Sequence, residues 1–377
     1  MSEPIAQQVL AGWGNHPRVA CQVVRPETQR ALRRSVAQAS GAEPVIARGL
    51  GRSYGDPAVS DQGRVVDCTR LDRYVDFDPR TGLLTCDAGV SLEQILRDFV
   101  PRGFLPMISP GTKFVTVGGC IANDVHGKAH HADGCFSRCV HSMQVLLASG
   151  EVVTASPTEH ADLFWASFGG MGLLGIITQA TIQLRKVETT YFRQQAVVVE
   201  NLDEMMDALD AHNHEPYLVA WVDSLATGDR LGRGVITLGD HATRAELPEK
   251  LASNPLAVSP PSPLAVPFEM PSGLLNTATI RALNVVLDQV QRRAAPIAHY
   301  EKFFYPLDFV GEWNRGYGGK GFTQYQFVIP LADGRAHIRE LLEIIATSGQ
   351  APFLNVLKRM GPERPETMLS FPFEGYT

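Results

Sequence analysis

The stretch Arg48-Gly49-Leu50-Gly51-Arg52-Ser53-Tyr54-Gly55-Asp56 decides how the first half of the chain is interpreted. It follows a short apolar segment, residues 44–48, that predicts a β-strand. Glycines at this spacing let backbone N–H groups crowd around an anion, and Arg52 adds a positive charge. The spacing is one residue longer than the dinucleotide-binding fingerprint, and Pro57 follows instead of a helix, which disfavours a Rossmann crossover. A plain glycine-rich turn is the alternative here.

Two further glycine-rich segments follow in the same half. The second comprises residues 110–112 and 116–128 (TVGGCIANDVHGK), whose small side chains would let a flat ligand lie against the backbone. Gly118 and Gly119 could open a short helix whose N-terminus faces a pyrophosphate. The third, residues 168–177 (FGGMGLLGII), leads into a predicted buried strand, and close helix–strand packing is its alternative explanation.

The composition excludes several classes of protein. A chain of 377 residues predicts two domains, and 44% hydrophobic with 20% charged residues is typical of a folded globular protein. The formal net charge of −6 argues against nucleic acid as the main partner. No apolar run reaches the roughly 18 residues of a membrane helix, and no signal peptide is visible. Six cysteines without a C-x-x-C pair indicate free thiols. We expect a cytoplasmic protein, or one peripheral to the inner membrane.

Short strands and helices alternate up to about residue 185, and the texture changes near Val187. We therefore expect domains at residues 1–186 and 187–377. In the first, the pattern predicts helices at 28–38, 91–100 and 160–168 and strands at 44–48, 64–68, 73–77, 83–87, 144–148, 152–155 and 173–184. In the second, it predicts helices at 202–212 and 333–348 and strands at 217–222, 322–329 and 352–358. Residues 255–271 hold six prolines, which predicts a surface loop or a mobile lid.

One segment has the residue types of a zinc site. Imidazole and thiolate ligands are offered by His126, His130, His131, Cys135, Cys139 and His141, with Asp124 and Asp133 nearby. The spacing does not fit, because Gly127 and Gly134 interrupt any helix and no C-x-x-C pair is present. We expect no metal; ordinary loop histidines with buried thiols, or contact of His126 and Lys128 with a cofactor or substrate, are the alternatives.

Taken in order, the three glycine segments resemble one family. The motifs ARGLGRSYGD, PGT-x(3)-TVGG-x-IA-x-D-x-HGK-x-HH and LFWA-x(2)-GG-x-GL-x-GII are similar to those of vanillyl-alcohol-oxidase-type flavoproteins, and within them the decaprenylphosphoryl-ribose 2′-oxidase group. The resemblance continues through residues 306–308, 311–315, 324–330 and 353–358, so it covers nearly the whole chain. The joint match is specific, whereas any single glycine motif is not.

The resemblance implies an α+β fold in which an FAD-binding domain of two α+β subdomains is joined to an antiparallel-sheet cap domain. It implies FAD bound by Gly49, Gly51, Arg52, Ser53, Tyr54, Gly55, Pro110, Gly111, Thr112, Val117, Gly118, Gly119, Asn123, His126, Gly127 and Ile177. Many relatives tether FAD through a histidine of the first loop. Because Tyr54 stands in that neighbourhood here, we expect non-covalent FAD.

The implied reaction is oxidation of a secondary alcohol, in which hydride leaves a sugar carbon for the flavin while a base takes the hydroxyl proton. The implied substrate is a polyprenyl-phosphate-linked ribofuranose oxidised at C2′, after which a partner keto-reductase completes epimerisation to arabinose. His126, Lys128 and Lys358 are the implied catalytic residues. The positions implied to face the substrate are Trp221, Gln324, Gln326, Asn355 and Lys358. A solvated lysine at a strand end is the alternative for Lys358.

Two departures from the family pattern are visible. Phe304 stands where close relatives carry a tyrosine beside the substrate. The chain also stops at Thr377, whereas relatives continue into a return to the FAD domain, so we expect a truncated cap. The alternatives are therefore a soluble aldonolactone or alditol oxidase that uses oxygen, and a flavin-binding protein without catalysis.

Overall fold

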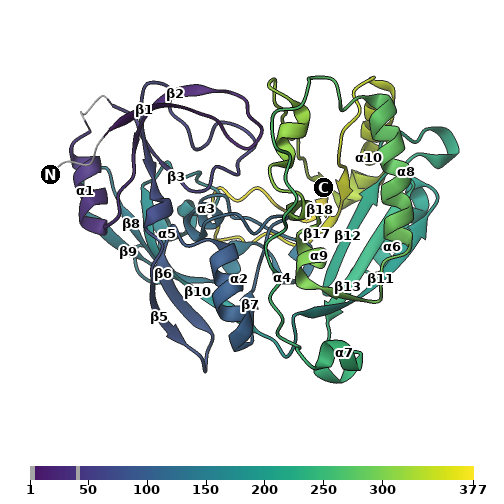
Figure 1. The fold of residues 1–377 in the computed structure, drawn as a ribbon, viewed down its shortest axis with the longest axis horizontal. Helices are drawn as coiled ribbons and strands as arrows, with labels where there is room; N and C mark the ends of the chain where they lie inside the picture. The colour runs from purple at the N-terminus through teal and green to yellow at the C-terminus, as the bar shows by residue number, and fades with distance from the viewer. Residues whose placement is uncertain (1–4, 40–42) are drawn as a thin grey trace.

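The computed structural model describes residues 5–39 and 43–377, which form two halves side by side (Figure 1). The strands of the first half end at Lys186, and those of the second begin at Tyr191. No strand of one half pairs with a strand of the other in the described residues. The strand pairing thus changes between Lys186 and Tyr191.

The first half contains two sheets. One has the order β1-β2-β4-β3, with β2 and β3 both parallel to β4. Its strands are β1 (Ala6–Leu10), β2 (Val19–Val24), β3 (Val45–Arg48) and β4 (Arg64–Asp67). The other is antiparallel, with the order β5-β6-β10-β8-β9 and β7 against β10. Its strands are β5 (Tyr74–Asp78), β6 (Leu83–Asp87), β7 (Phe104–Pro106), β8 (Val140–Leu146), β9 (Val152–Ala155) and β10 (Ile176–Lys186).

The helices of this half are α1 (Gln29–Ala37), α2 (Leu92–Phe99), α3 (Val117–Ala122), α4 (His130–Asp133) and α5 (Ala161–Ser167). Ser91 caps α2 as its sequence predicts, because its hydroxyl accepts from Gln94 N while the Gln94 side chain accepts from Ser91 N. The apolar face of α2 packs into the core over the antiparallel sheet.

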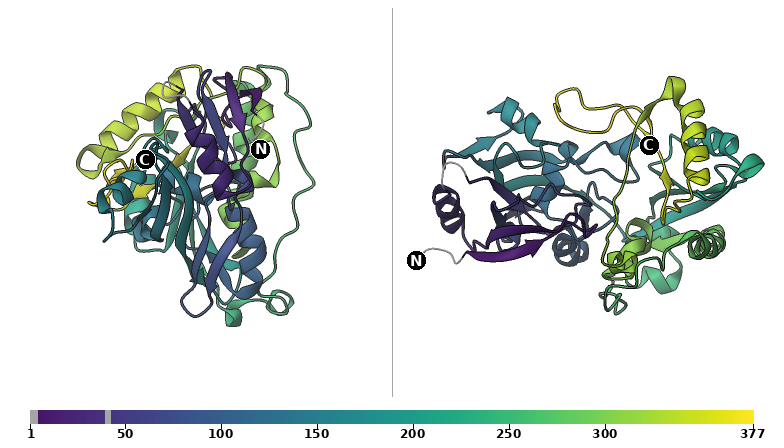
Figure 2. Two further views of the ribbon diagram at one scale, coloured as in Figure 1. Left: turned by 90° about the vertical axis from the view of Figure 1, so that its left-hand side faces the viewer. Right: turned by 90° about the horizontal axis from the view of Figure 1, so that it is seen from above.

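The second half is built on an antiparallel sheet of order β14-β11-β13-β12-β16. Its strands are β11 (Tyr191–Val199), β12 (Tyr217–Val222), β13 (Gly234–His241), β14 (Ile297–His299) and β16 (Val356–Leu357). A small sheet adds β15 (Ile329–Pro330), β17 (Arg359–Met360) and β18 (Gly375–Tyr376). The helices are α6 (Leu202–Ala211), α7 (Glu249–Ala252), α8 (Thr277–Arg292), α9 (Tyr300–Phe304) and α10 (Leu331–Thr347). The two further views in Figure 2 show α8 and α10 flanking this sheet. The mixture of helices and antiparallel sheets confirms the α+β class.

Three strand predictions are wrong in extent. Of the predicted strand 322–329 only Ile329, the first residue of β15, pairs with another strand, and of 352–358 only Val356–Leu357. A strand needs a neighbour for its N–H and C=O groups, and Phe322 N donates instead to Gly14 O, 2.8 Å away. The predicted strand 173–184 begins at Ile176, because Gly172 and Gly175 adopt positive φ angles that suit a turn.

The two halves share an apolar cluster. Leu96, Val100 and Leu105 of the first half pack with Phe192, Tyr217 and the aromatic residues around α9. The Pro-rich segment 255–271 is irregular, as predicted. No helix in residues 5–39 and 43–377 has the length and hydropathy needed to cross a bilayer.

Candidate active site

The three glycine-rich segments are neighbours in the fold. A Cβ atom added at Gly49 of the first would lie 2.3 Å from Thr116 Oγ1 of the second. Within the second segment, a Cβ at Gly127 would lie 2.2 Å from Ser109 O. Met171 N of the third donates to Ala122 O at 2.9 Å. Stretches that are far apart in sequence therefore approach to distances that only glycine permits.

The second segment folds as its sequence predicts. Helix α3 begins at Val117, and the Thr116 side chain caps it by accepting from Gly119 N at 3.2 Å. Asn123 follows the helix, with its Nδ2 donating to Gly119 O at 2.8 Å. Space remains beside Pro110 and Thr112, because a Cβ at Gly111 would meet no atom within 4 Å.

The side chain of Arg52 is suited to bind a phosphate-bearing cofactor. Its Nε is buried and has no hydrogen-bond partner. Burial lowers the pKa of its guanidinium, which remains a cation because an arginine pKa is very high to begin with. A desolvated cationic donor next to the open backbone of Gly55 suits a phosphate oxygen. The donor set therefore fits the pyrophosphate of FAD.

Tyr54 lies in the part of the first loop where many relatives of the resembled family carry a histidine bonded to FAD. Its ring packs edge-on against Phe322, with 5.5 Å between the ring centroids. Burial raises the pKa of the phenol, and the nearby Asp308 raises it further. The hydroxyl therefore stays protonated near neutral pH.

His126, Lys358 and Gln326 come together from three separate segments. Lys358 Nζ lies 3.2 Å from His126 Nδ1, and Gln326 Nε2 lies 3.4 Å from His126 Nε2. Burial lowers the pKa of His126 well below its usual value, and the neighbouring Lys358 lowers it further, so the imidazole is neutral. Burial also lowers the pKa of Lys358 to about 8. A neutral histidine thus faces an amine that titrates near physiological pH.

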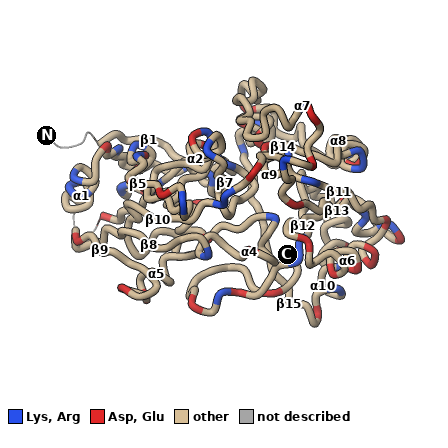
Figure 3. The backbone as a smooth tube through the Cα atoms, turned by 90° about the horizontal axis from the view of Figure 1, so that it is seen from below, with Lys and Arg blue, Asp and Glu red and all other residues tan. Residues whose placement is uncertain are grey.

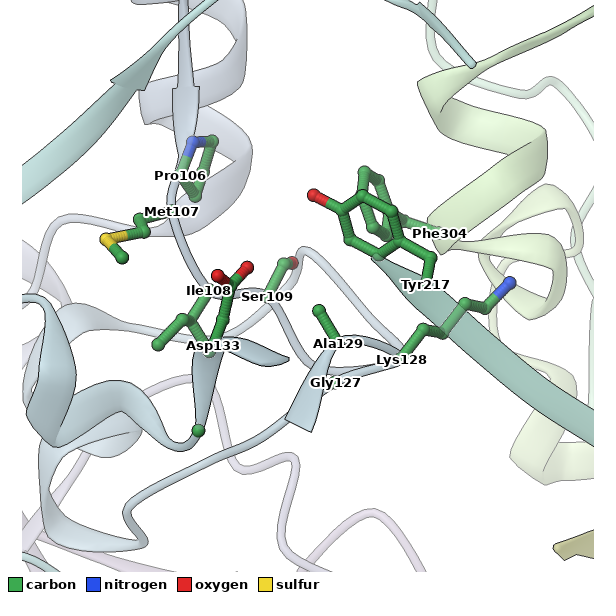
Figure 4. Close-up of a pocket in the computed structure, with 11 residues that line it drawn as sticks. Pro106, Met107, Ile108, Ser109, Gly127, Lys128, Ala129, Asp133, Tyr217 and Phe304 are labelled. Atoms are coloured by element: carbon green, nitrogen blue, oxygen red, sulfur yellow. The ribbon is translucent and has the colours of Figure 1, made fainter. Parts of the chain in front are cut away.

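Lys128 points elsewhere. Its Nζ donates to Phe303 O, and the ammonium lies 4.7 Å from the centroid of the Phe303 ring. Figure 4 shows a pocket beside it, where Tyr217 and Phe304 from the second half face Ser109 and Met107 from the first, while the Lys128 ammonium is directed away from them. Burial lowers the pKa of Lys128 to about 8. Lys128 is therefore close to His126 in sequence, but its side chain has different partners.

Of the remaining predicted positions, Trp221, Gln324 and Asn355 lie on the second half and Ile177 on the first. Trp221 is buried on β12 opposite Val356, and the next residue, Val222, donates to Asn355 O at 3.3 Å. Gln324 lies on the extended segment two residues before Gln326, and its side chain is exposed. Ile177 is buried in β10. The structure thus brings Trp221 of β12 close to Asn355, which directly precedes β16.

The histidines and cysteines of the zinc-like segment have separate partners. His130 Nδ1 accepts from Gly361 N at 3.1 Å, and His131 Nε2 contacts Glu215 O at 2.6 Å. Cys135 and Cys139 are buried free thiols whose pKa burial raises. Across residues 5–39 and 43–377, no three His, Cys, Asp or Glu side chains gather as ligands of one metal ion.

Sequence reasoning missed Trp13. Its ring centroid lies 3.7 Å from the guanidinium carbon of Arg52. Its backbone N donates to Ser53 O at 2.6 Å. The signal was its setting between Gly12 and Gly14, which indicates backbone pressed closely against other parts of the chain.

Several known proteins are similar to this chain in sequence. Residues 20–156 match the FAD binding domain family. The chain is 39% identical to decaprenylphosphoryl-beta-D-ribose oxidase of Mycolicibacterium smegmatis, over 99% of this chain and 82% of the relative. It is 32% identical to an uncharacterized protein of Streptomyces coelicolor, over 76% and 79% of the two chains. It is 30% identical to L-gulono-1,4-lactone dehydrogenase of Mycobacterium tuberculosis, over 57% and 51%.

The fold and the site define an FAD-dependent oxidoreductase with an α+β FAD-binding domain. The phosphate-compatible donors of the first glycine segment agree with that cofactor. The chain belongs to the family of flavoprotein oxidases that includes decaprenylphosphoryl-beta-D-ribose oxidase.

Replacing Gly49 with alanine should lower FAD content, because the new methyl group would displace the Thr116 side chain that caps α3. Overpacking of this kind costs about 1–3 kcal/mol, so we expect an FAD dissociation constant roughly five- to hundredfold higher. The flavin-to-protein absorbance ratio and FAD titration measure it. Gly316→Ala is the control, because its Cβ would meet no atom within 4 Å. Equal FAD affinity in the wild type and Gly49→Ala would contradict the packing argument.

Proposed function

We propose that this chain oxidises a secondary hydroxyl of a lipid-linked ribose, at C2′ of the sugar. The similarity to an oxidase named for decaprenylphosphoryl-β-D-ribose extends over nearly the whole chain. The observation that carries the proposal is the approach of Lys358 to His126, with Gln326 beside the same imidazole. Three positions predicted separately for catalysis and substrate contact are thereby adjacent.

In this proposal Lys358 accepts the hydroxyl proton. A base works best when its pKa lies near the working pH, and the pKa of Lys358 is lowered to about 8. His126, which burial keeps neutral, can accept a hydrogen bond at Nδ1 and so orient the amine. Bound FAD would supply the hydride acceptor. Trp221, Gln324, Gln326 and Asn355 would surround the sugar, whereas Lys128, whose Nζ donates to Phe303 O, would act only through the contact between the halves.

Lys358→Met should lower kcat by about 10²–10⁴-fold, which is the usual contribution of a general base. In the wild type, turnover should rise between pH 7 and 9, because only the deprotonated amine accepts a proton and it is lost as the pH falls below about 8. Stopped-flow reduction of the bound flavin by the sugar measures both effects. Lys250→Met, on the exposed surface of α7, is the control.

Lys358→Arg separates a base from a simple cationic contact. Arginine keeps hydrogen-bond donors but stays protonated at these pH values. We expect no recovery of kcat in this variant. Full activity in Lys358→Arg would show that the residue only binds substrate oxygen atoms.

We also propose that FAD is held without a covalent bond. Support comes from Tyr54, which lies where a tethering histidine would be expected. Burial raises the pKa of its phenol, so the hydroxyl stays protonated. Acid precipitation of the holoenzyme should leave a colourless pellet and a yellow supernatant. Flavin fluorescence that stays with the denatured polypeptide on a gel would refute non-covalent binding.

A lipid-linked substrate requires approach to a bilayer, and we propose that α8 and the preceding segment make this contact. Val285, Val286 and Val290 form an exposed stripe on α8, and Phe268 is 62% exposed in the Pro-rich segment. Both elements lie toward the viewer in Figure 1 (Figures 1 and 2). Basic positions on α8 are blue in Figure 3. Apolar side chains among arginines suit an anionic bilayer surface.

Vesicles that contain phosphatidylglycerol should co-float with the protein, and the double variant Val286→Ser/Val290→Ser should co-float less. Both valines are more than half exposed, so their loss removes buried apolar area only in the bound state. Val9→Ser, which is 69% exposed on β1 of the other half, is the matched control. Equal flotation of all three proteins would exclude this surface.

The proposed oxidation leaves a ketone on the sugar. A partner keto-reductase would therefore be the next enzyme.

An aldonolactone oxidase is the second candidate, because a lactone dehydrogenase is 30% identical over 57% of the chain. Hydrogen peroxide formed from small lactones or polyols, without turnover of a prenyl-phosphate sugar, would favour it.

A further inference from the structure

The segment Gly12-Trp13-Gly14 lies between the first glycine loop and the second half of the chain. Trp13 N donates to Ser53 O at 2.6 Å, and Trp13 O accepts from Asn314 Nδ2 at 2.9 Å. The Trp13 ring also packs edge-on against Trp313, with 5.8 Å between the ring centroids. A single residue near the N-terminus therefore contacts the loop and the second half together.

The two glycines make this contact sterically feasible. A Cβ at Gly12 would lie 2.3 Å from Ser53 O, and a Cβ at Gly14 would lie 2.3 Å from Phe322 O. Both neighbours are backbone atoms, which cannot move aside as a flexible side chain can. Only Trp13 within this segment therefore projects a side chain into the region beside Arg52.

The Trp13 ring holds one face of Arg52. The guanidinium carbon lies 3.7 Å from the Trp13 ring centroid and 5.2 Å from that of Phe114. Guanidinium stacking on an aromatic face fixes the plane of the group without using its N–H donors. The Nε of Arg52 is indeed buried and without a hydrogen-bond partner. The arrangement leaves the Nε donor of Arg52 desolvated, oriented and without a hydrogen-bond partner, although the carboxylates of Asp308 and Glu312 lie near enough to attract the guanidinium.

We propose that Trp13 is a positioning residue for FAD binding: it stacks on Arg52 and keeps its donors directed to an anion, the cofactor pyrophosphate. Asn314 extends the arrangement, because it holds the Trp13 carbonyl from the second half. The affinity for FAD thus depends on a contact with the second half of the chain, outside the three glycine segments predicted to bind FAD. The inference rests on FAD as the cofactor and is independent of which sugar is oxidised.

The test is FAD affinity, measured by titrating FAD into flavin-depleted full-length protein and following quenching of flavin fluorescence. Trp13→Leu should raise the dissociation constant about tenfold, as expected for loss of a largely desolvated cation–π contact. Trp13→Phe keeps an aromatic face and should stay within about threefold of the wild type. Ile344→Leu, on the exposed surface of α10, is the control and should leave the affinity unchanged.

A double-mutant cycle distinguishes positioning from general loss of structure. Arg52→Met removes the guanidinium, so Trp13→Leu should change FAD affinity by less than about twofold in that background. A tenfold loss in both backgrounds would show that Trp13 acts without Arg52, and would overturn the proposal. Unchanged affinity in Trp13→Leu alone would also overturn it. Sugar turnover is not part of this measurement, so failure of the proposed reaction would leave the result distinct.

Asn314→Leu tests the link to the second half. It removes the hydrogen bond to Trp13 O, and we expect FAD affinity to fall in the same direction as in Trp13→Leu, by a smaller factor. Wild-type affinity in Asn314→Leu would refute the part of the proposal that concerns the second half.

Discussion

Close approach of backbone to backbone is the constraint on which the site depends. At Gly12, Gly14 and Gly127, an added Cβ would fall within 2.3 Å of a carbonyl oxygen from another segment. Such contacts leave no room for a side chain. The facing carbonyl groups are those of Ser53 in the first glycine segment, Ser109 just before the second, and Phe322, whose ring packs against Tyr54. The glycines therefore set the distance between segments, whereas the cationic and polar side chains occupy positions that this distance defines.

Burial then determines the charge state of the groups that the glycines bring together. His126 loses its charged form because desolvation and the nearby Lys358 both act in that direction. Burial also lowers the pKa of Lys358, to about 8, so its amine loses its proton near physiological pH. The same desolvation at Lys128 gives a similar pKa, although its Nζ is bound to Phe303 O. The perturbed pKa values of these three residues therefore mark side chains that are buried between the two halves. Their hydrogen-bond partners distinguish Lys358, the candidate base, from Lys128, which joins the halves.

The sequence was most informative where structure is local. The capping box at Ser91 and the start of α3 after Thr116 follow from side chains within four residues of each other. The predicted strand 322–329 failed because alternation specifies which side chains share a face, while pairing depends on a neighbour that the local sequence does not encode. Trp13 was missed for the same reason, since its partners Ser53, Arg52 and Asn314 are distant in sequence.

The grouping of His126 with Lys358 shows what the family resemblance added. Residue types alone left Lys358 with a solvated alternative, whereas the fold places its amine 3.2 Å from a buried imidazole. The resemblance placed Lys128 at the flavin edge with His126, yet its ammonium is bound between the halves. In a regular strand, side chains two residues apart point to the same face. Lys128 instead lies in a turn that follows Gly127, so it does not share the direction of His126. In the proposed function His126 would serve the reacting end of the site, whereas Lys128 joins the two halves through its hydrogen bond to Phe303 O.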